Sequence, residues 1–125
     1  SGIIGRFSDS MDEREFLIWT KKVMECDAIR HTSLTGKKIT KVAICGGSGA
    51  FLLNNAIDQE ADAFITSDFK YHQFFNADNR ILVADIGHYE SEHFTIELIN
   101  DVLKNNFPTF AVRLSKINTN PVNYF

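Results

Sequence analysis

The sequence predicts an α/β fold, with a mostly parallel or mixed sheet that carries helices on both faces. Apolar segments of strand length alternate with helix-like segments along the chain, a pattern typical of parallel strands joined by helices. One strand candidate, residues 81–86, is almost continuously apolar, as a strand covered on both faces requires. Glycine-rich or polar residues also follow three successive strands, which is where open sheets carry their sites.

Length and composition indicate one compact domain over residues 1–125. With 125 residues, 44% apolar and 23% charged, the chain lies in the globular range. A net charge of −3 with scattered basic residues argues against nucleic acid as a partner. Two cysteines without a Cys-x-x-Cys spacing fit a reducing cytoplasm. No apolar stretch approaches the roughly 20 residues of a spanning helix, so no membrane partner is expected.

The first part of the chain predicts a strand end or turn and then a helix. Residues 2–5 (Gly-Ile-Ile-Gly) are typical of the strand end or turn. Ser10 and Glu13 have the Ser-x-x-Glu spacing of a capping box and predict a helix that continues to about Glu25. Trp19 lies off the apolar stripe of this helix. It is either a partly exposed packing residue or a platform for a ligand.

A glycine-rich turn follows the next two strand candidates, residues 28–32 and 41–45. Residues 46–49 (Gly-Gly-Ser-Gly) lead into helical spacing over residues 50–59. Such a turn offers backbone N–H groups to an anion, although it matches neither the phosphate-loop nor the dinucleotide pattern. The other interpretation is a tight turn that needs glycine for close packing. Both interpretations stay open.

The next strand candidate delivers polar side chains to the same edge of the sheet. Residues 61–66 lead to Asp68, and a helix through residues 70–75 carries His72 four positions later. Strand ends of an open sheet are where such folds bind ligands.

Residues 87–93 (Gly-His-Tyr-Glu-Ser-Glu-His) follow the apolar strand and form the strongest candidate site. On a helix that begins near Tyr89, His88 and Glu92 point the same way. Mixed nitrogen and oxygen donors suit zinc, manganese, iron, cobalt or nickel. Two ligands do not hold a catalytic metal, so others must come from elsewhere in the fold or from another chain.

The C-terminal part predicts one long helix and one last strand. The helix covers about residues 89–105, and Pro108 fits its end. Its expected buried face consists of Phe94, Ile96, Leu98, Ile99, Val102 and Leu103. Alternating apolar residues predict a final strand over residues 110–114, and residues 118–121 read as a polar turn.

Four ordered segments together carry a family resemblance. They are residues 42–49 (Val-Ala-Ile-Cys-Gly-Gly-Ser-Gly), 65–72 (Ile-Thr-Ser-Asp-Phe-Lys-Tyr-His), 87–92 (Gly-His-Tyr-Glu-Ser-Glu) and 119–121 (Thr-Asn-Pro). They resemble the C-terminal half of the NIF-three-like family, whose members are often named GTP cyclohydrolase 1 type 2 homologues. The resemblance implies one half of a duplicated fold, in which two similar α/β halves enclose a two-metal centre. It also makes residues 2–5 look like the chain returning from an inserted domain, which would place a domain boundary there.

The resemblance carries specific residues. In that family the second half supplies a His and a Glu four residues later, and His88 and Glu92 match these positions. Glu90 does not match, and we expect it to face solvent or to lie behind the ligands. The His pair and Asp of the first half have no counterpart here, so the remaining ligands would come from a missing N-terminal half. Ser67 stands where the family typically has glycine, which affects the local loop shape.

The resemblance implies a protein that binds two divalent metal ions and hydrolyses a small nucleotide or phosphoester-like substrate. In such a site His72 would act as acid or base, with Asp68 orienting it. The alternative for His72 is a hydrogen-bonded pocket residue without chemistry. A ring-like homo-oligomer is also implied, so a non-catalytic metal-binding scaffold or interaction protein stays open. A third reading is a small anion-binding module that uses residues 46–49 alone.

Overall fold

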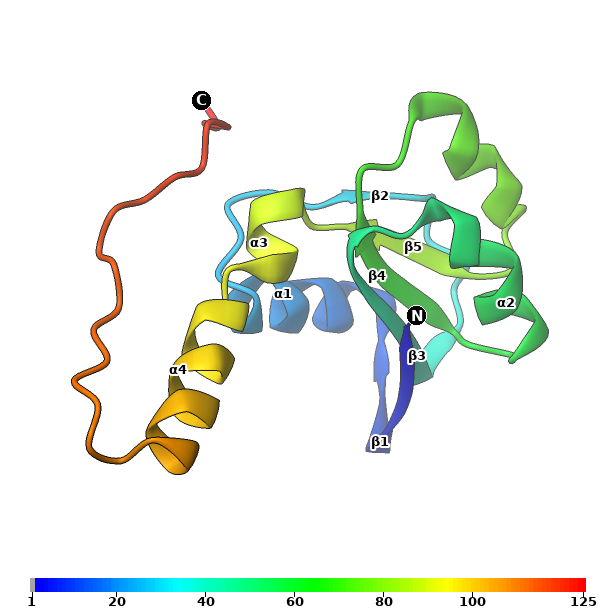
Figure 1. The fold of residues 1–125 in the computed structure, drawn as a ribbon. Coiled ribbons are helices and arrows are strands. Elements are labelled where there is room, and N and C mark those ends of the chain that lie inside the picture. Colours follow the sequence, from blue (N-terminus) through cyan, green and yellow to red (C-terminus); the bar gives the residue numbers. More distant parts are fainter. Residues whose placement is uncertain (1) are drawn as a thin grey trace.

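The computed structural model describes residues 2–125 and contains one five-stranded sheet in the order β1-β3-β4-β5-β2 (Figure 1). The strands are β1 (Ile3–Asp12), β2 (Arg30–His31), β3 (Lys38–Ser48), β4 (Ala63–Ser67) and β5 (Leu82–Asp85). The three central strands are parallel, whereas β1 and β2 pair antiparallel with β3 and β5 at the two edges. The predicted mixed α/β sheet is therefore confirmed.

Helices cover both faces of this sheet. They are α1 (Glu13–Val23), α2 (Leu53–Asp58), α3 (His88–Glu92) and α4 (Thr95–Asn106), with 3₁₀ helices η1 (Ala50–Leu52) and η2 (Tyr71–Ala77). The helix expected over residues 70–75 is thus the 3₁₀ helix η2. None of the helices within residues 2–125 combines the length and apolarity that crossing a membrane requires.

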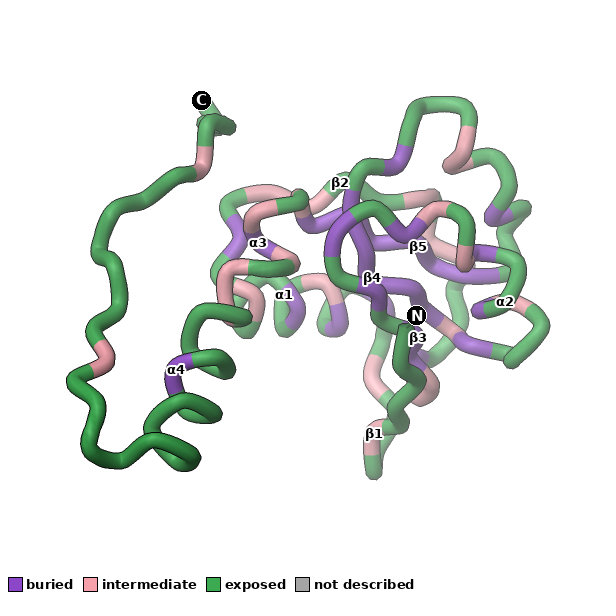
Figure 2. The backbone as a smooth tube through the Cα atoms, in the orientation of Figure 1, coloured by how far each residue is buried: buried purple, intermediate pink, exposed green. Residues whose placement is uncertain are grey.

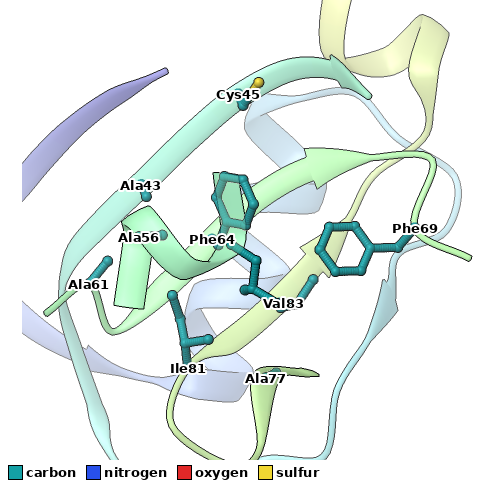
Figure 3. Packing of buried hydrophobic residues seen from close by; sticks show 10 residues of the cluster. Ala43, Cys45, Ala56, Ala61, Phe64, Phe69, Ala77, Ile81 and Val83 are labelled. Atoms are coloured by element: carbon teal, nitrogen blue, oxygen red, sulfur yellow. The ribbon is translucent and has the colours of Figure 1, made fainter. Parts of the chain in front are cut away.

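Alternate residues of the central strands build two hydrophobic cores. Phe64 of β4 and Val83 of β5 face one core, which contains residues of α2 and η2 (Figure 3). Their strand neighbours, among them Ile65 and Leu82, face the other core, which forms around Phe16 of α1. Because both faces are covered, every residue of β4 and β5 is buried. This explains why these strands read as continuous apolar runs.

The N-terminal region differs from the prediction in two ways. Residues 2–5 do not form a strand end or turn, because Ile3 begins a ten-residue edge strand, β1, and pairs with Ile44. Ser10 does not cap α1, because pairing with β3 keeps the backbone extended as far as Asp12. Asp12 caps the helix instead and accepts a hydrogen bond from the Glu15 backbone N–H at 2.8 Å.

Trp19 has the role of a packing residue. Its ring meets that of Phe7 edge to face with centroids 5.0 Å apart and stacks on Phe16 at 6.3 Å. The packing interpretation of its sequence position is therefore confirmed.

The C-terminal region also departs from the prediction. The expected single helix over residues 89–105 is divided into α3 and α4, and α4 extends away from the sheet (Figure 1). The face expected to be buried is exposed, for example by 65% at Leu98 and 51% at Val102 (Figure 2). Residues 110–114 form no strand. A strand requires a neighbour to accept its hydrogen bonds, and none of residues 2–125 pairs with this segment.

Candidate functional site

The carboxyl ends of the three parallel strands meet at one edge of the sheet. Ser48 of β3 lies opposite Ser67 of β4, and Thr66 lies opposite Asp85 of β5. The chain leaves β5 through Gly87, whose φ of 95° is unfavourable for residues with a side chain. A Cβ at Gly87 would also lie 2.2 Å from Glu90 Oε2. This turn starts α3 directly above the strand ends.

His88, the first residue of α3, lies between two carboxylates. Its Nδ1 is 2.6 Å from Asp68 Oδ2, and its Nε2 is 3.2 Å from Glu92 Oε2. The hydrogen bond with Asp68 is the main cause that raises the pKa of His88 above its ordinary value, and Glu92 adds to the effect. The structure thus brings together His88 and Glu92, the two metal ligands expected from the sequence, and adds Asp68.

Within residues 2–125, Asp68 pairs with His88 and forms no hydrogen bond with His72, the residue that we expected it to orient. Asp68 has a left-handed backbone with a φ of 60°, and its carboxylate is directed at His88. His72 lies exposed on η2 and makes no side-chain hydrogen bond within residues 2–125. The alternative of a hydrogen-bonded pocket residue is therefore not supported for His72. Its role as an acid or base remains a prediction.

The glycine-rich turn packs against α3. The backbone N–H of Gly47 donates a hydrogen bond to Ser91 Oγ at 2.8 Å, and its carbonyl accepts one from Thr66 Oγ1 at 3.2 Å. Gly47 has a φ of 65°, and a Cβ there would lie 2.5 Å from Glu92 Oε1. A Cβ at Gly49 would lie 2.1 Å from Thr66 Oγ1. These contacts favour the close-packing interpretation of residues 46–49 over an anion site.

Asp85 is a buried carboxylate at the end of β5. Its Oδ2 accepts a hydrogen bond from the Phe69 backbone N–H at 2.9 Å, and its Oδ1 accepts one from Gly87 N–H at 3.2 Å. Arg30 of β2 forms an ion pair with it. Asp85 therefore ties together the segments that carry Asp68 and His88. The signal for this role in the sequence is a charged residue at the end of an apolar strand, and Asp85 was not among the predicted site residues.

Glu90 does not face solvent. The residue is only 7% exposed, and its Oε1 accepts a hydrogen bond from Asn120 Nδ2 at 3.0 Å. Burial, together with the negative charges of Glu90 and Asp85, raises the pKa of Tyr124. Asn120 and Tyr124 belong to the C-terminal segment, so this segment closes one side of the site. No local pattern pointed to Tyr124 or to Arg30.

A cavity of about 690 Å³ lies between the strand ends and the C-terminal segment. Arg30, Asp68, His88, Glu92 and Tyr124 are among its lining residues. Within residues 2–125, no group of three His, Cys, Asp or Glu side chains is arranged to hold a metal ion. Asp68 and Glu92 approach different nitrogens of the His88 ring, so the three side chains do not converge on one point.

Comparison with known proteins places this chain beside proteins about twice its length or more. It is 36% identical over 118 residues to a Campylobacter jejuni protein named GTP cyclohydrolase 1 type 2 homolog, an alignment that covers 94% of this chain and 46% of that protein. A Staphylococcus epidermidis protein of the same name is 36% identical over 131 residues, which cover 98% of this chain and 35% of the relative. The chain therefore spans less than half the length of these curated relatives.

Solved structures show the same relationship. Staphylococcus aureus protein SA1388 superimposes with a TM-score of 0.85 and 27% identity, over 99% of this chain and 42% of that one. A Bacillus cereus protein related to NIF3 shares the fold with a TM-score of 0.83 and 23% identity, over 99% and 36% of the two chains. These coverages agree with one half of a duplicated fold. The chain also matches Duf34/NIF3 (NGG1p interacting factor 3) over residues 1–121, and it therefore belongs to that family.

Proposed function

We propose that this chain contributes part of a two-metal centre to a metal-dependent hydrolase that acts on a nucleotide or phosphoester-like substrate. The observation that carries the proposal is the position of His88 between Asp68 and Glu92. A histidine that binds a metal usually donates the N–H of its other ring nitrogen to a carboxylate. Asp68 at 2.6 Å from Nδ1 is suited to accept that hydrogen bond. The Nε2 lone pair then faces the side of Glu92, and these two groups are the proposed ligands.

The residues present fit a divalent metal in two respects, the type of donor atom and the room around the Glu92 carboxylate. One imidazole nitrogen and one carboxylate suit zinc, manganese, iron, cobalt or nickel. The missing Cβ of Gly47 leaves the room that Glu92 Oε1 occupies. Bound ions of this kind polarise a phosphoryl group and lower the pKa of a coordinated water.

Two donors are too few for a complete centre. We propose that the remaining ligands lie in an N-terminal half, outside residues 2–125, and that this chain is the C-terminal half of a two-half protein. The coverage of 46% and 35% of the two relatives supports this proposal. Within this chain, His72 remains the proposed acid or base, because its exposed imidazole is free to contact a substrate.

A second candidate function is a non-catalytic metal-binding scaffold that assembles into a ring-like homo-oligomer. The exposed apolar face of α4 favours it, because 65% exposure at Leu98 and 53% at Ile99 is costly unless another surface covers them. Both functions suit a reducing cytoplasm. Cys26 and Cys45 are buried free thiols, and burial raises the pKa of Cys26.

Metal analysis by elemental mass spectrometry tests the centre, on the chain alone and on the longer protein proposed to contain it. We expect His88→Ala and Glu92→Ala to lose bound metal. His31→Ala is the matched control, because His31 is an exposed imidazole on β2. Unchanged metal content in both site variants would refute the centre.

Turnover separates the two functions. For a hydrolase, release of phosphate or nucleoside from a panel of nucleotides and phosphodiesters falls with metal content in the same variants. His72→Ala is expected to keep the metal and lose turnover. Stoichiometric metal without turnover of any panel member, in a protein that sediments as a ring, would favour the scaffold.

A further inference from the structure

A second cavity adjoins the proposed centre at Arg30. It has a volume of about 520 Å³ and lies between the β2 region and η2, and we call it the aromatic groove. The lining residues that bear on binding are Arg30, Ser33, Tyr71, Phe74, Phe75 and Asn79. Arg30 also lines the cavity of about 690 Å³ that contains His88. Both volumes lie in the range of roughly 300–1,000 Å³ typical of small-molecule sites, and the two cavities share Arg30 as a wall.

Three aromatic side chains line the groove, and two of them, Tyr71 and Phe75, are exposed. Tyr71 is 80% exposed and Phe75 67%, with their rings edge to face at a centroid distance of 5.4 Å. Phe74 is half-buried and is anchored by Phe69 of the core, 5.2 Å away. Contiguous exposed apolar surface of this kind marks a ligand site or an interaction surface. The flat bases of nucleotides stack on aromatic side chains, and this stacking depends little on which base is bound.

Arg30 supplies a positioned cation at the end of the groove. Its Nη2 is held by Asp85 and by the Phe69 carbonyl at 2.9 Å, and its Cζ lies 5.5 Å from the centre of the Phe74 ring. Within residues 2–125, its other guanidinium nitrogens have no hydrogen-bond acceptor, and the side chain is 60% exposed. With both hydrogens of Nη2 in use, the Nη1 and Nε N–H groups remain, and a cation that presents such donors can give a charge-assisted hydrogen bond to a phosphate oxygen.

We infer that the aromatic groove binds the base of a nucleoside phosphate, with the phosphate on Arg30. The base stacks on the exposed ring of Phe75, and Ser33 and Asn79 are lining residues whose polar side chains suit its polar edge. The phosphate then lies at the wall shared with the cavity of His88. This inference names the substrate class of the proposed function and rests on it for the reaction. Binding itself requires no metal.

Calorimetric titration of the purified chain with GMP, in buffer containing a chelator, tests the inference. Guanosine lacks the phosphate and ribose 5-phosphate lacks the base, so each should bind about tenfold or more weakly than GMP. Phe75→Ala should weaken GMP by a similar factor. Phe51→Ala is the matched control, because Phe51 is 71% exposed but lies outside the groove. Arg30→Lys, which keeps a cation beside buried Asp85, should weaken GMP but leave guanosine unchanged.

The outcomes separate this inference from the metal centre. GMP binding that survives His88→Ala and falls with Phe75→Ala supports the groove, whatever the metal analysis shows. No GMP binding at millimolar concentration, or equal binding by Phe75→Ala and Phe51→Ala, overturns it and leaves the metal centre standing. A chain that sediments as a dimer and becomes monomeric on Phe75→Ala also overturns it, because the aromatic surface would then cover a second copy.

Discussion

Asp68 and His88 are twenty residues apart in sequence, yet Asp68 Oδ2 lies 2.6 Å from His88 Nδ1. They follow adjacent parallel strands, β4 and β5. Asp68 has a φ of 60°, and His88 follows Gly87 with a φ of 95°, so an unusual backbone conformation accompanies each residue of the pair. The contact joins a residue expected to be catalytic with one expected to bind metal.

Asp68→Asn should weaken metal binding in the complete protein. Loss of the carboxylate that orients a metal-binding histidine typically lowers affinity by about 10- to 100-fold. Asp78→Asn is a suitable control, since Asp78 is also left-handed, with a φ of 49°, and its side chain is 80% exposed. Competition with a metallochromic chelator measures both affinities. Equal affinities of Asp68→Asn and Asp78→Asn would contradict a positioning role for Asp68.

Gly47→Ala should destabilise the fold and disturb Glu92. The new Cβ would lie 2.5 Å from Glu92 Oε1, and the φ of 65° is strained for alanine. We expect a loss of about 1–2 kcal/mol in the free energy of unfolding from the backbone alone. Gly5→Ala is the control, because no atom lies within 4 Å of its added Cβ and its φ is not positive. Urea denaturation followed by circular dichroism compares the two variants.

Glu13 should make stability depend on acid pH. Burial raises the pKa of Glu13, but hydrogen bonds from Thr35 and Gly36 outweigh it and lower the pKa below its ordinary value near 4.5. The folded form therefore favours the ionised carboxylate. Its contribution is complete above the unfolded pKa and is lost as the pH falls through the lowered folded pKa.

Glu13→Gln tests this dependence. At neutral pH we expect it to cost about 1–3 kcal/mol, because charged hydrogen bonds to Thr35 and Gly36 are lost. The difference from the unsubstituted chain should shrink as the pH falls below 4.5. Glu15→Gln, at an exposed position of the same helix, should change stability little at any pH. Thermal melts across an acid pH series would show a constant difference if the Glu13 carboxylate were not linked to folding.

Leu98→Glu in α4 should leave the chain almost as stable as before. The Leu98 side chain is 65% exposed, and exposed substitutions usually change stability by less than about 0.5 kcal/mol. Leu82→Ala in β5 is the contrast, because that side chain is fully buried and its truncation should cost about 2–5 kcal/mol. Guanidinium unfolding measures both. A large loss for Leu98→Glu would mean that α4 packs within the chain after all.

The meeting of Asp68 and His88 at one edge of the sheet was predictable from the strand ends. Parallel strands in the order β3-β4-β5 bring their carboxyl ends to one edge, so Asp68 and His88 had to be neighbours once the sheet was correct. Which histidine Asp68 pairs with, His72 or His88, could not be predicted from the sequence. Helical spacing favoured His72, but residues 71–77 form a 3₁₀ helix and a left-handed Asp68 turns its carboxylate toward α3.

The sequence by itself determined the elements whose patterns arise from burial on both faces, such as β4 and β5, and the i,i+4 pairing of His88 with Glu92. These features depend on local geometry and on one hydrophobic period. Only the tertiary structure decided that Glu90 is buried against Asn120, that Arg30 pairs with Asp85, and that the apolar face of α4 stays exposed. Each of these depends on which segment, distant in the sequence, packs against the residue. A local sequence pattern does not specify that segment.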